Sequence, residues 1–328
     1  MLPLRPGIVA AALLAAASVA VAESAQQARS LLEDMVEASR VLEYQGRFLY
    51  SQGGRLSTME ISHAVIDGRE YERLAHLDGD VSELIRQGRD VVSVDRNRRI
   101  TRLPPGESLP PLDLAERMQA LPGQYNVLID GDDRVAGRDA VRVRVAPLDE
   151  HRYGYRLWLD RESSLLLRSE LVNENGQAME RMEFVSLELA PGLSREDFRV
   201  SGIPERVVRN VESLEDPGGD AGIEPGWLPE GFRQVARDLR RGGPRGAPVY
   251  SQTFSDGLAA FTVFAEPVDE SATVDEGISR IGPSVAVSRY LDSDNRSHLL
   301  TLVGEIPLST AERVISALRL LSDEVTEP

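Results

Sequence analysis

The chain has 328 residues, of which 41% are hydrophobic, so it is long enough to form two folded domains. It contains no cysteine, which excludes disulfide bonds and cysteine chemistry. The formal net charge is -16, and such an acidic surface repels nucleic acid and anionic membranes at long range. We therefore expect no nucleic-acid partner.

The first 22 residues have the composition of a secretory signal peptide. Arg5 precedes an apolar run over residues 8–19, and the small residues Ala20 and Ala22 mark a cleavage site before Glu23. The apolar run is too short to span a bilayer comfortably. Removing residues 1–22, which carry one arginine and no acid, leaves 36 basic and 53 acidic residues, or -17. We predict an exported protein that is soluble after cleavage.

The amino-terminal part of the mature chain predicts one helix followed by a meander of strands. Ser24 and Gln27 form a capping box that begins a helix ending near Glu43. From Tyr44 the apolar period changes to two, with a turn at Gly53-Gly54. Strands are predicted at 48–50, 59–61, 65–66, 70–74, 91–94, 125–130, 138–146, 153–160, 164–171 and 179–189, with a short helix over 112–121. This order predicts an α+β domain with a large curved antiparallel sheet.

The stretch from Tyr153 to Leu171 predicts a hairpin with one apolar face. If Asp160 and Ser164 close the turn, Leu159 lies opposite Leu165 and Leu157 opposite Leu167. The inner face then carries Tyr153, Tyr155, Leu157, Leu159, Leu165, Leu167 and Leu171.

On the other face of the same hairpin, Trp158 would lie opposite Leu166. Arg156 would lie opposite Arg168, a like-charge pair that needs relief from Glu170 or solvent. We expect this face to point outward, where a second domain or a partner would cover Trp158.

A second domain is predicted after a linker over residues 207–226. The linker contains EDPGGDAGIEPG at 215–226, and its glycine, proline and acidic content predicts a mobile middle. Strands are predicted at 232–239, 248–255, 258–265, 284–291 and 298–303. A closing helix is predicted from a Ser309-x-x-Glu312 capping box, with Val314, Leu318 and Leu321 on one face.

The sequence contains no group of residues with the spacing typical of a catalytic or metal-binding site. The four histidines, His63, His76, His151 and His298, are scattered singly, so we expect no metal and no cofactor. The chain is not expected to be an enzyme; a secreted hydrolase is a weaker option because carboxylates are numerous. Arginines form two clusters, at Arg96, Arg98, Arg99 and Arg102 and at Arg237, Arg240, Arg241 and Arg245. Each cluster is either a solvated strand face or a receptor for an acidic peptide or lipid headgroup.

Six stretches of the chain resemble the MucB/RseB family. They are VLEYQGRFLYSQGG (41–54), VAGRDAVRVRVAP (135–147), YGYRLWLDRESSLLLRSEL (153–171), WLPEGF (227–232), VYSQTFSDGLAAFTVF (249–264) and LVGEIP (302–307). The resemblance covers essentially the whole mature chain, and the segments come in the family's order. MucB/RseB proteins are periplasmic negative regulators of the sigma-E type envelope-stress response.

The resemblance implies a fold and a division into domains. The amino-terminal domain would be similar to the lipoprotein carrier LolA, a half-open antiparallel β-barrel with helices, and a smaller α/β domain with an antiparallel sheet would follow. We expect a signal peptide at 1–22, a LolA-like sensor domain at 23–206, a linker at 207–226 and a partner-binding domain at 227–328. The protein would be periplasmic.

The resemblance also implies a function without catalytic residues. The protein would bind the periplasmic part of a single-span anti-sigma factor, shield it from proteolysis and release it on lipid or lipopolysaccharide signals. Candidate lipid-facing residues are Phe48, Tyr50, Met59, Ile61, Tyr153, Tyr155, Leu157, Leu159, Leu165 and Leu167. Candidate partner-binding residues are Trp158, Arg237, Arg240, Arg241 and Arg245. A periplasmic lipid or lipoprotein carrier of the LolA type is the alternative, since the same sheet would serve it.

Overall fold

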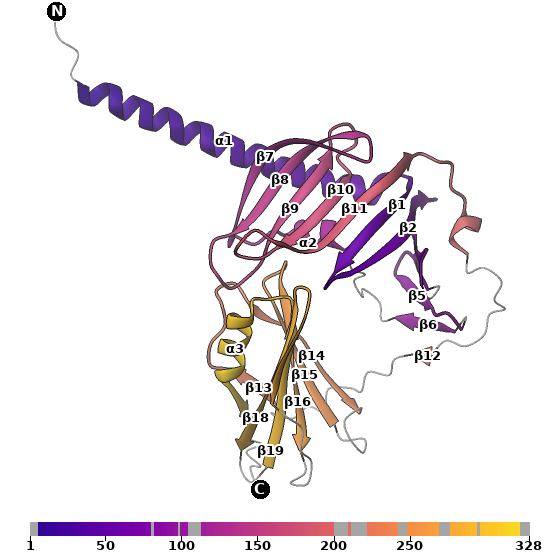
Figure 1. The fold of residues 1–328 in the computed structure, drawn as a ribbon, viewed down its shortest axis with the longest axis vertical. Helices are drawn as coiled ribbons and strands as arrows, with labels where there is room; N and C mark the ends of the chain where they lie inside the picture. Colours follow the sequence, from indigo (N-terminus) through magenta and orange to yellow (C-terminus); the bar gives the residue numbers. More distant parts are fainter. Residues whose placement is uncertain are drawn as a thin grey trace, which may run out of the picture.

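The chain forms two sheet domains, a larger one built on its first two thirds and a smaller one on its last third (Figure 1). The computed structural model describes residues 6–79, 82–97, 99–103, 113–199, 209–210, 222–241, 248–268, 276–293 and 296–321. Below, the large domain is the twelve-stranded sheet with the helices α1 and α2. The small domain is the six-stranded sheet with the helix α3 and one two-stranded ribbon.

The large sheet has the order β12-β6-β5-β4-β3-β2-β1-β11-β10-β9-β8-β7. Its strands are β1 (Tyr44–Gln52), β2 (Arg55–Ile66), β3 (Arg69–His76), β4 (Glu83–Gln87), β5 (Asp90–Val94), β6 (Ile100–Leu103), β7 (Tyr125–Val135), β8 (Arg138–Pro147), β9 (Gly154–Asp160), β10 (Leu166–Val172), β11 (Ala178–Leu189) and β12 (Arg209–Asn210). Neighbours pair antiparallel except β12 with β6. Among the described strands β7 and β12 do not pair with each other, so the sheet is open. The expected half-open antiparallel barrel is confirmed.

Local turn chemistry fixes the meander where the sequence predicted turns. Gly53 and Gly54 both have positive φ, which glycine adopts without strain and which the β1–β2 hairpin requires. Asp67 and Gly68 turn β2 into β3 in the same way. The strands β4 and β6 were not predicted, because both are short and lack a regular apolar alternation.

The helix α1 (Pro6–Val41) lies across one face of the large sheet, and its amino-terminal part extends away from the sheet (Figure 1). Among residues 23–41 of this helix, whose burial is described, the first buried residue is Ala28. The predicted start at Ser24 is wrong, because the alanine-rich sequence before it continues the helix without a break. The short helix α2 (Leu114–Met118) packs against α1 and adds its apolar side chains to the core.

The predicted hairpin exists as β9 and β10, but its register differs. Leu159 pairs with Leu166, and Trp158 pairs with Arg168, so the ladder shifts by one residue at Leu167. The expected pairs of Leu159 with Leu165 and Leu157 with Leu167 are therefore wrong. A bulge inserts one residue into one strand, and every later side chain changes its opposite neighbour.

The shifted register also replaces the expected like-charge pair. Arg156 lies opposite Glu170 rather than Arg168, and the two form an ion pair at 2.8 Å. Arg168 forms a second ion pair with the same carboxylate. The bulge thus places a buried glutamate between two arginines, which removes the repulsion that the unshifted register would cause.

The small domain is an antiparallel sheet with the order β14-β15-β16-β19-β18-β17. Its strands are β14 (Arg233–Arg241), β15 (Pro248–Ser255), β16 (Ala260–Val268), β17 (Gly277–Ile281), β18 (Ser284–Ser293) and β19 (Arg296–Gly304). The helix α3 (Leu308–Ser316) packs on β18 and β19, so the expected smaller domain with an antiparallel sheet is confirmed.

The end of the small domain differs from the sequence prediction. The cap of α3 is Pro307 rather than Ser309, and the helix ends at Ser316. Leu318 and Leu321 belong to the strand β20 (Leu318–Leu321), not to the helix. This strand pairs with β13 (Gly222–Pro225), which lies within the predicted linker. Residues 211–221, where a mobile middle was predicted, lie outside the described residues.

Candidate binding site

The candidate lipid-facing residues, with one exception, lie on the face of the large sheet that α1 covers. Tyr153, Tyr155, Leu157 and Leu159 share a buried cluster with Leu32, Met35 and Val36 of α1 and with residues of α2. Phe48, Tyr50, Met59, Ile61 and Leu165 pack together beside Ala38 of α1. The structure therefore brings these residues onto one surface, and helices cover it.

Leu167 is the exception. It packs with Val135, Ala140 and Trp158 in a separate cluster, not with Leu157. Trp158 follows Leu157 in β9, so the two side chains point to opposite faces of the sheet. The bulge at Leu167 turns this side chain to the Trp158 side, and its expected inner position is wrong.

A small cavity of about 40 Å³ lies beneath the helices, lined by Ser39, Tyr44, Ile61, Ala115, Leu165, Leu166, Met182, Phe184 and Leu187. This volume admits water but is far below the roughly 300–1,000 Å³ of a small-molecule site. An acyl chain can fill this cavity only if α1 or α2 moves.

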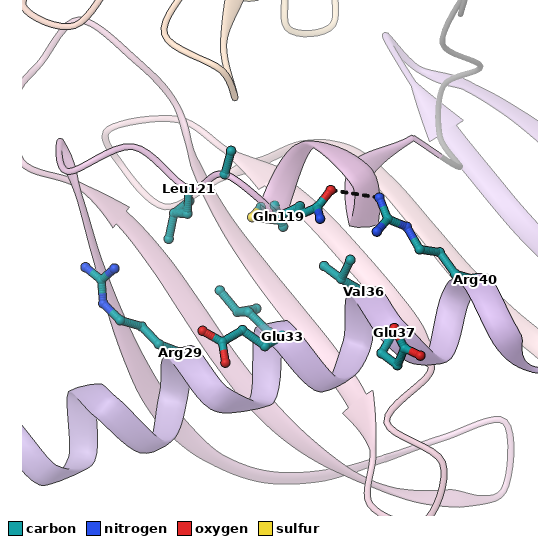
Figure 2. Close-up of a pocket in the computed structure, with 10 residues that line it drawn as sticks. Arg29, Glu33, Val36, Glu37, Arg40, Gln119 and Leu121 are labelled. Carbon is teal, nitrogen blue, oxygen red and sulfur yellow. Dashed lines mark hydrogen bonds between the residues drawn. The ribbon is translucent and has the colours of Figure 1, made fainter.

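A larger groove lies between α1 and α2 and is shown in Figure 2. Its volume is about 330 Å³. The apolar lining residues are Leu32, Val36, Met118, Ala120 and Leu121, and the polar ones are Arg29, Glu33, Glu37, Arg40 and Gln119. Two arginines and two glutamates give the rim no net charge, so the groove suits an amphipathic ligand with a neutral or zwitterionic head.

One polar contact bridges the groove. Nη2 of Arg40 donates a hydrogen bond of 2.7 Å to Oε1 of Gln119, joining α1 to the residue after α2 (Figure 2). Sequence reasoning missed this groove. Its signal is the helical spacing of Arg29, Glu33 and Glu37, which places a charged row beside the apolar stripe of α1.

Trp158 does not point to an open surface as expected. Its side chain is 3% exposed, and its Nε1 donates a hydrogen bond of 2.8 Å to Asp133. The guanidinium of Arg168 stacks on the indole, 3.9 Å from the ring centroid. The large domain itself covers Trp158, so a partner cannot reach the ring without local opening.

The four candidate arginines of the small domain lie in or after its edge strand. Arg237 is exposed in β14, and Arg240 and Arg241 are the last positions of that strand before its end. Arg245 lies outside the described residues. Among the described strands β14 pairs only with β15, so the arginines follow an edge of the small sheet.

The two domains meet at a contact that sequence reasoning missed, which we call the domain seam. Its centre is Arg152, in the loop before β9, whose side chain is fully buried. Nη1 of Arg152 lies 2.5 Å from Oδ2 of Asp256, and Nη2 donates to the carbonyl of Glu230 at 2.7 Å. The guanidinium also lies over the ring of Phe232, 5.2 Å from its centroid.

Further contacts extend the domain seam on both sides of Arg152. His151 Nδ1 lies 3.1 Å from the hydroxyl of Thr310, and the hydroxyl of Tyr153 donates to the carbonyl of Ile306 at 3.1 Å. The side chain of Leu258, from the small domain, packs into the buried hydrophobic cluster of the large domain. No local pattern in the sequence predicts these contacts, because they join residues that are 78 or more positions apart.

A group of acidic side chains lies at the same seam. Burial, together with the charge of Glu305, raises the pKa of Glu180 to about 7. Burial also raises the pKa of Glu305, against the opposing effect of Arg117. Arg117 is held by Asp113 at 3.2 Å and donates to the carbonyl of Leu258 at 3.1 Å.

The described residues include no group of three or more histidine, aspartate or glutamate side chains placed to hold a metal ion. Nor do they include a helix both long and apolar enough to cross a membrane.

The fold and the site define the class of protein, which is a two-domain α+β protein. An open sheet wraps around a helix, and a smaller sheet domain docks against one end of the large sheet. Two family models match the chain, the MucB/RseB N-terminal domain at residues 27–201 and the MucB/RseB C-terminal domain at residues 219–319. The chain belongs to the MucB/RseB family.

Two related proteins are similar to this chain over nearly their whole length. The sigma factor AlgU regulatory protein MucB of Pseudomonas aeruginosa is 38% identical over 91% of this chain and 92% of its own. The sigma-E factor regulatory protein RseB of Haemophilus influenzae is 27% identical over 92% of this chain and 94% of its own.

Solved structures agree with the fold. The complex structure of Pseudomonas aeruginosa MucA/MucB contains a chain that matches with a TM-score of 0.74 at 35% identity, over 90% of this chain and 99% of that one. MucB in complex with MucA(peri) matches with a TM-score of 0.71 at the same identity and coverage. The crystal structure of MucB matches with a TM-score of 0.60 at 32% identity, over 90% of this chain and 98% of that one.

Proposed function

We propose that this protein is a negative regulator of a sigma-E type envelope-stress response, which acts by binding the periplasmic part of a single-span anti-sigma factor. The observation that carries the proposal is the similarity of both domains, in one chain, to MucB solved with MucA(peri). Bound to this protein, the anti-sigma factor would be shielded from proteolysis. Residues 1–22 would direct export to the periplasm and be removed there.

We propose the small domain as part of the surface that receives the anti-sigma segment. The edge strand β14 presents exposed Arg237 and carries Arg240 and Arg241 at its end. An edge strand offers unpaired backbone groups to an extended peptide, and arginine recognises carboxylates with paired donors. An acidic extended segment is the chemistry that fits this edge.

Calorimetry of the mature chain with the periplasmic segment of its anti-sigma factor tests the proposal. We expect a complex that Arg237→Glu weakens. The matched control is Arg55→Glu, which reverses an exposed arginine at the start of β2 in the large domain. If the segment does not bind, the proposed function is wrong. If both variants bind like the wild type, only the assignment of the β14 edge is wrong.

Release by lipid or lipopolysaccharide is the second part of the proposal. The groove between α1 and α2 and the apolar face beneath it are the surfaces that would accept an acyl chain. A lipid shifts the equilibrium only if it binds the free protein and the complex with different affinity. We therefore expect weaker binding of the anti-sigma segment in the presence of lipid. Equal affinity with and without lipid would exclude the switch.

A further inference from the structure

The turn between β15 and β16 reaches from the small domain into the apolar interior of the large one. Leu258 in this turn is 1% exposed. Among the described residues of the small domain, it alone belongs to the buried cluster that contains Leu32, Met118 and Leu157. These three residues come from α1, α2 and β9, so Leu258 takes up apolar space between the sheet and the helices.

The short helix α2 and the residues after it hold this turn in place, together with Arg152 at the domain seam. Nη1 of Arg117, in α2, donates a hydrogen bond of 3.1 Å to the carbonyl of Leu258. Gly257 lies against the segment that follows α2, because a Cβ added to it would be 3.6 Å from the carbonyl oxygen of Ala120. The position of the turn therefore depends on the position of α2.

The same segment forms one wall of the groove between α1 and α2. The groove is lined on this side by Met118, Gln119, Ala120 and Leu121, and α1 lines it on the other side (Figure 2). Residues 117–122 thus contact both the groove and the turn of the small domain. A displacement of α2 that widens the groove also disturbs the contacts of Leu258.

The interior has no room for an acyl chain while both helices keep their positions. The cavity beneath them has a volume of about 40 Å³, so α1 or α2 must move before a chain can enter. The helix α1 packs on β2 and β7, whereas α2 has only five residues, and α2 is therefore the easier of the two to displace. Its displacement breaks the hydrogen bond from Arg117 to Leu258 and weakens the docking of the small domain.

We propose that α2 and Leu258 couple the lipid groove to the domain seam, so that an acyl chain in the interior and a fully docked small domain exclude each other. This inference rests on the proposed release by lipid and adds the residue of the small domain that opposes the lipid. Coupling between two sites is reciprocal, so loss of Leu258 favours lipid binding as much as lipid favours undocking. Undocking would move the small domain, which carries the β14 edge.

The test uses the full mature chain and palmitoyl lysophosphatidylcholine, a zwitterionic lipid with one acyl chain, below its micelle concentration. The sequence contains no cysteine, so Leu148→Cys and Glu312→Cys provide the only two thiols for a fluorescence donor and acceptor. Both positions are exposed, and they flank the contact between His151 and Thr310. Undocking therefore lowers the transfer efficiency. Calorimetry with the same lipid measures its affinity.

In the labelled chain we expect the lipid to lower the transfer efficiency. Leu258→Ala is expected to bind the lipid about fivefold more tightly or better, because the docked turn then opposes the acyl chain less. Leu258→Val, which removes less of the side chain, should shift the affinity in the same direction by a smaller factor. The matched control is Leu318→Ala, at a leucine buried in the small domain's own cluster, and it should bind the lipid like the wild type.

Three results would overturn the proposal. The first is lipid binding that leaves the transfer efficiency unchanged, and the second is an affinity of Leu258→Ala equal to that of the wild type. The third is an equal gain in Leu318→Ala, which would assign the effect to general destabilisation of the small domain. If Leu258→Ala fails to fold, Leu258→Val decides by the same comparison.

A wild type that does not bind this lipid would also overturn the coupling, and with it the proposed release by such a lipid. It would leave the proposed regulator intact, because binding of the anti-sigma segment is measured by calorimetry without lipid. The two failures are therefore distinguishable.

Discussion

The guanidinium of Arg152 and the carboxylate of Asp256 lie 2.5 Å apart, and neither side chain has any exposed surface. Asp256 also accepts hydrogen bonds of 2.8 Å from the backbone of Leu258 and Ala259, so it caps its own turn while it holds Arg152. A buried pair of this kind is costly to break from one side, because the remaining charge stays in a poorly solvated site. The pair therefore fixes where the small domain sits.

Replacing Arg152 by methionine is expected to lower the free energy of unfolding by about 3–5 kcal/mol, as for other buried pairs that lose one partner. Chemical denaturation of wild type and variant measures the change. The control is Arg161→Met, which breaks the exposed pair with Asp132 and should cost at most about 1 kcal/mol. Equal effects of the two substitutions would mean that Arg152 contributes no more than a surface pair.

Leu157 is fully buried between the large sheet and α1. We expect Leu157→Ala to cost about 2–5 kcal/mol, because it removes apolar contacts and leaves a cavity. Leu56→Ala, at a leucine of β2 that is 63% exposed, should change stability by no more than about 0.5 kcal/mol. Thermal denaturation followed by circular dichroism compares them. A small loss in Leu157→Ala would show that α1 does not pack on this face.

His63 joins the end of α1 to the sheet and should make stability depend on pH. Its Nδ1 donates to the carbonyl of Leu42 at 2.7 Å, and its Nε2 lies 3.5 Å from Glu70. Burial opposes the charged imidazole, but the Glu70 carboxylate, the Leu42 carbonyl and Glu72 together raise its pKa. Since the pKa is raised on folding, the contribution of His63 is complete below about 6.5 and is lost as the pH rises through the raised value.

The difference in melting temperature between wild type and His63→Gln should therefore shrink as the pH is raised from 6 to 8.5. Taking the difference at each pH removes the effect of other groups, including Glu180. His76→Gln, at a half-buried histidine at the end of β3, is the control. A difference that is constant over this range would contradict a charged His63 in the folded protein.

Gly304 at the end of β19 has no room for a side chain. A Cβ there would lie 2.4 Å from Cβ of Phe261 and 2.7 Å from the carbonyl oxygen of Ala260. We expect Gly304→Ala to destabilise the protein by about 1–3 kcal/mol through overpacking. Gly277→Ala meets nothing within 4 Å and should be nearly neutral. Urea denaturation of the two variants distinguishes them, and a neutral Gly304→Ala would mean that β16 and β19 can move apart.

The sequence by itself determined the features that depend on neighbouring residues, namely turns and single strands. Gly53-Gly54 predicts a turn because glycine adopts the positive φ that the turn requires, and the alternation from Tyr153 to Leu159 predicts a strand whatever packs on it. The family resemblance also held over both domains.

Only the tertiary structure decided the hairpin register and the domain seam. A bulge at Leu167 costs little locally, and the packing of Trp158 with Arg168 and of Glu170 between two arginines selects it. Arg152 and Asp256 are 104 positions apart, and each is an unremarkable charged residue in a loop. Their roles follow from burial and charge balance between elements brought together by folding, which no local pattern in the chain records.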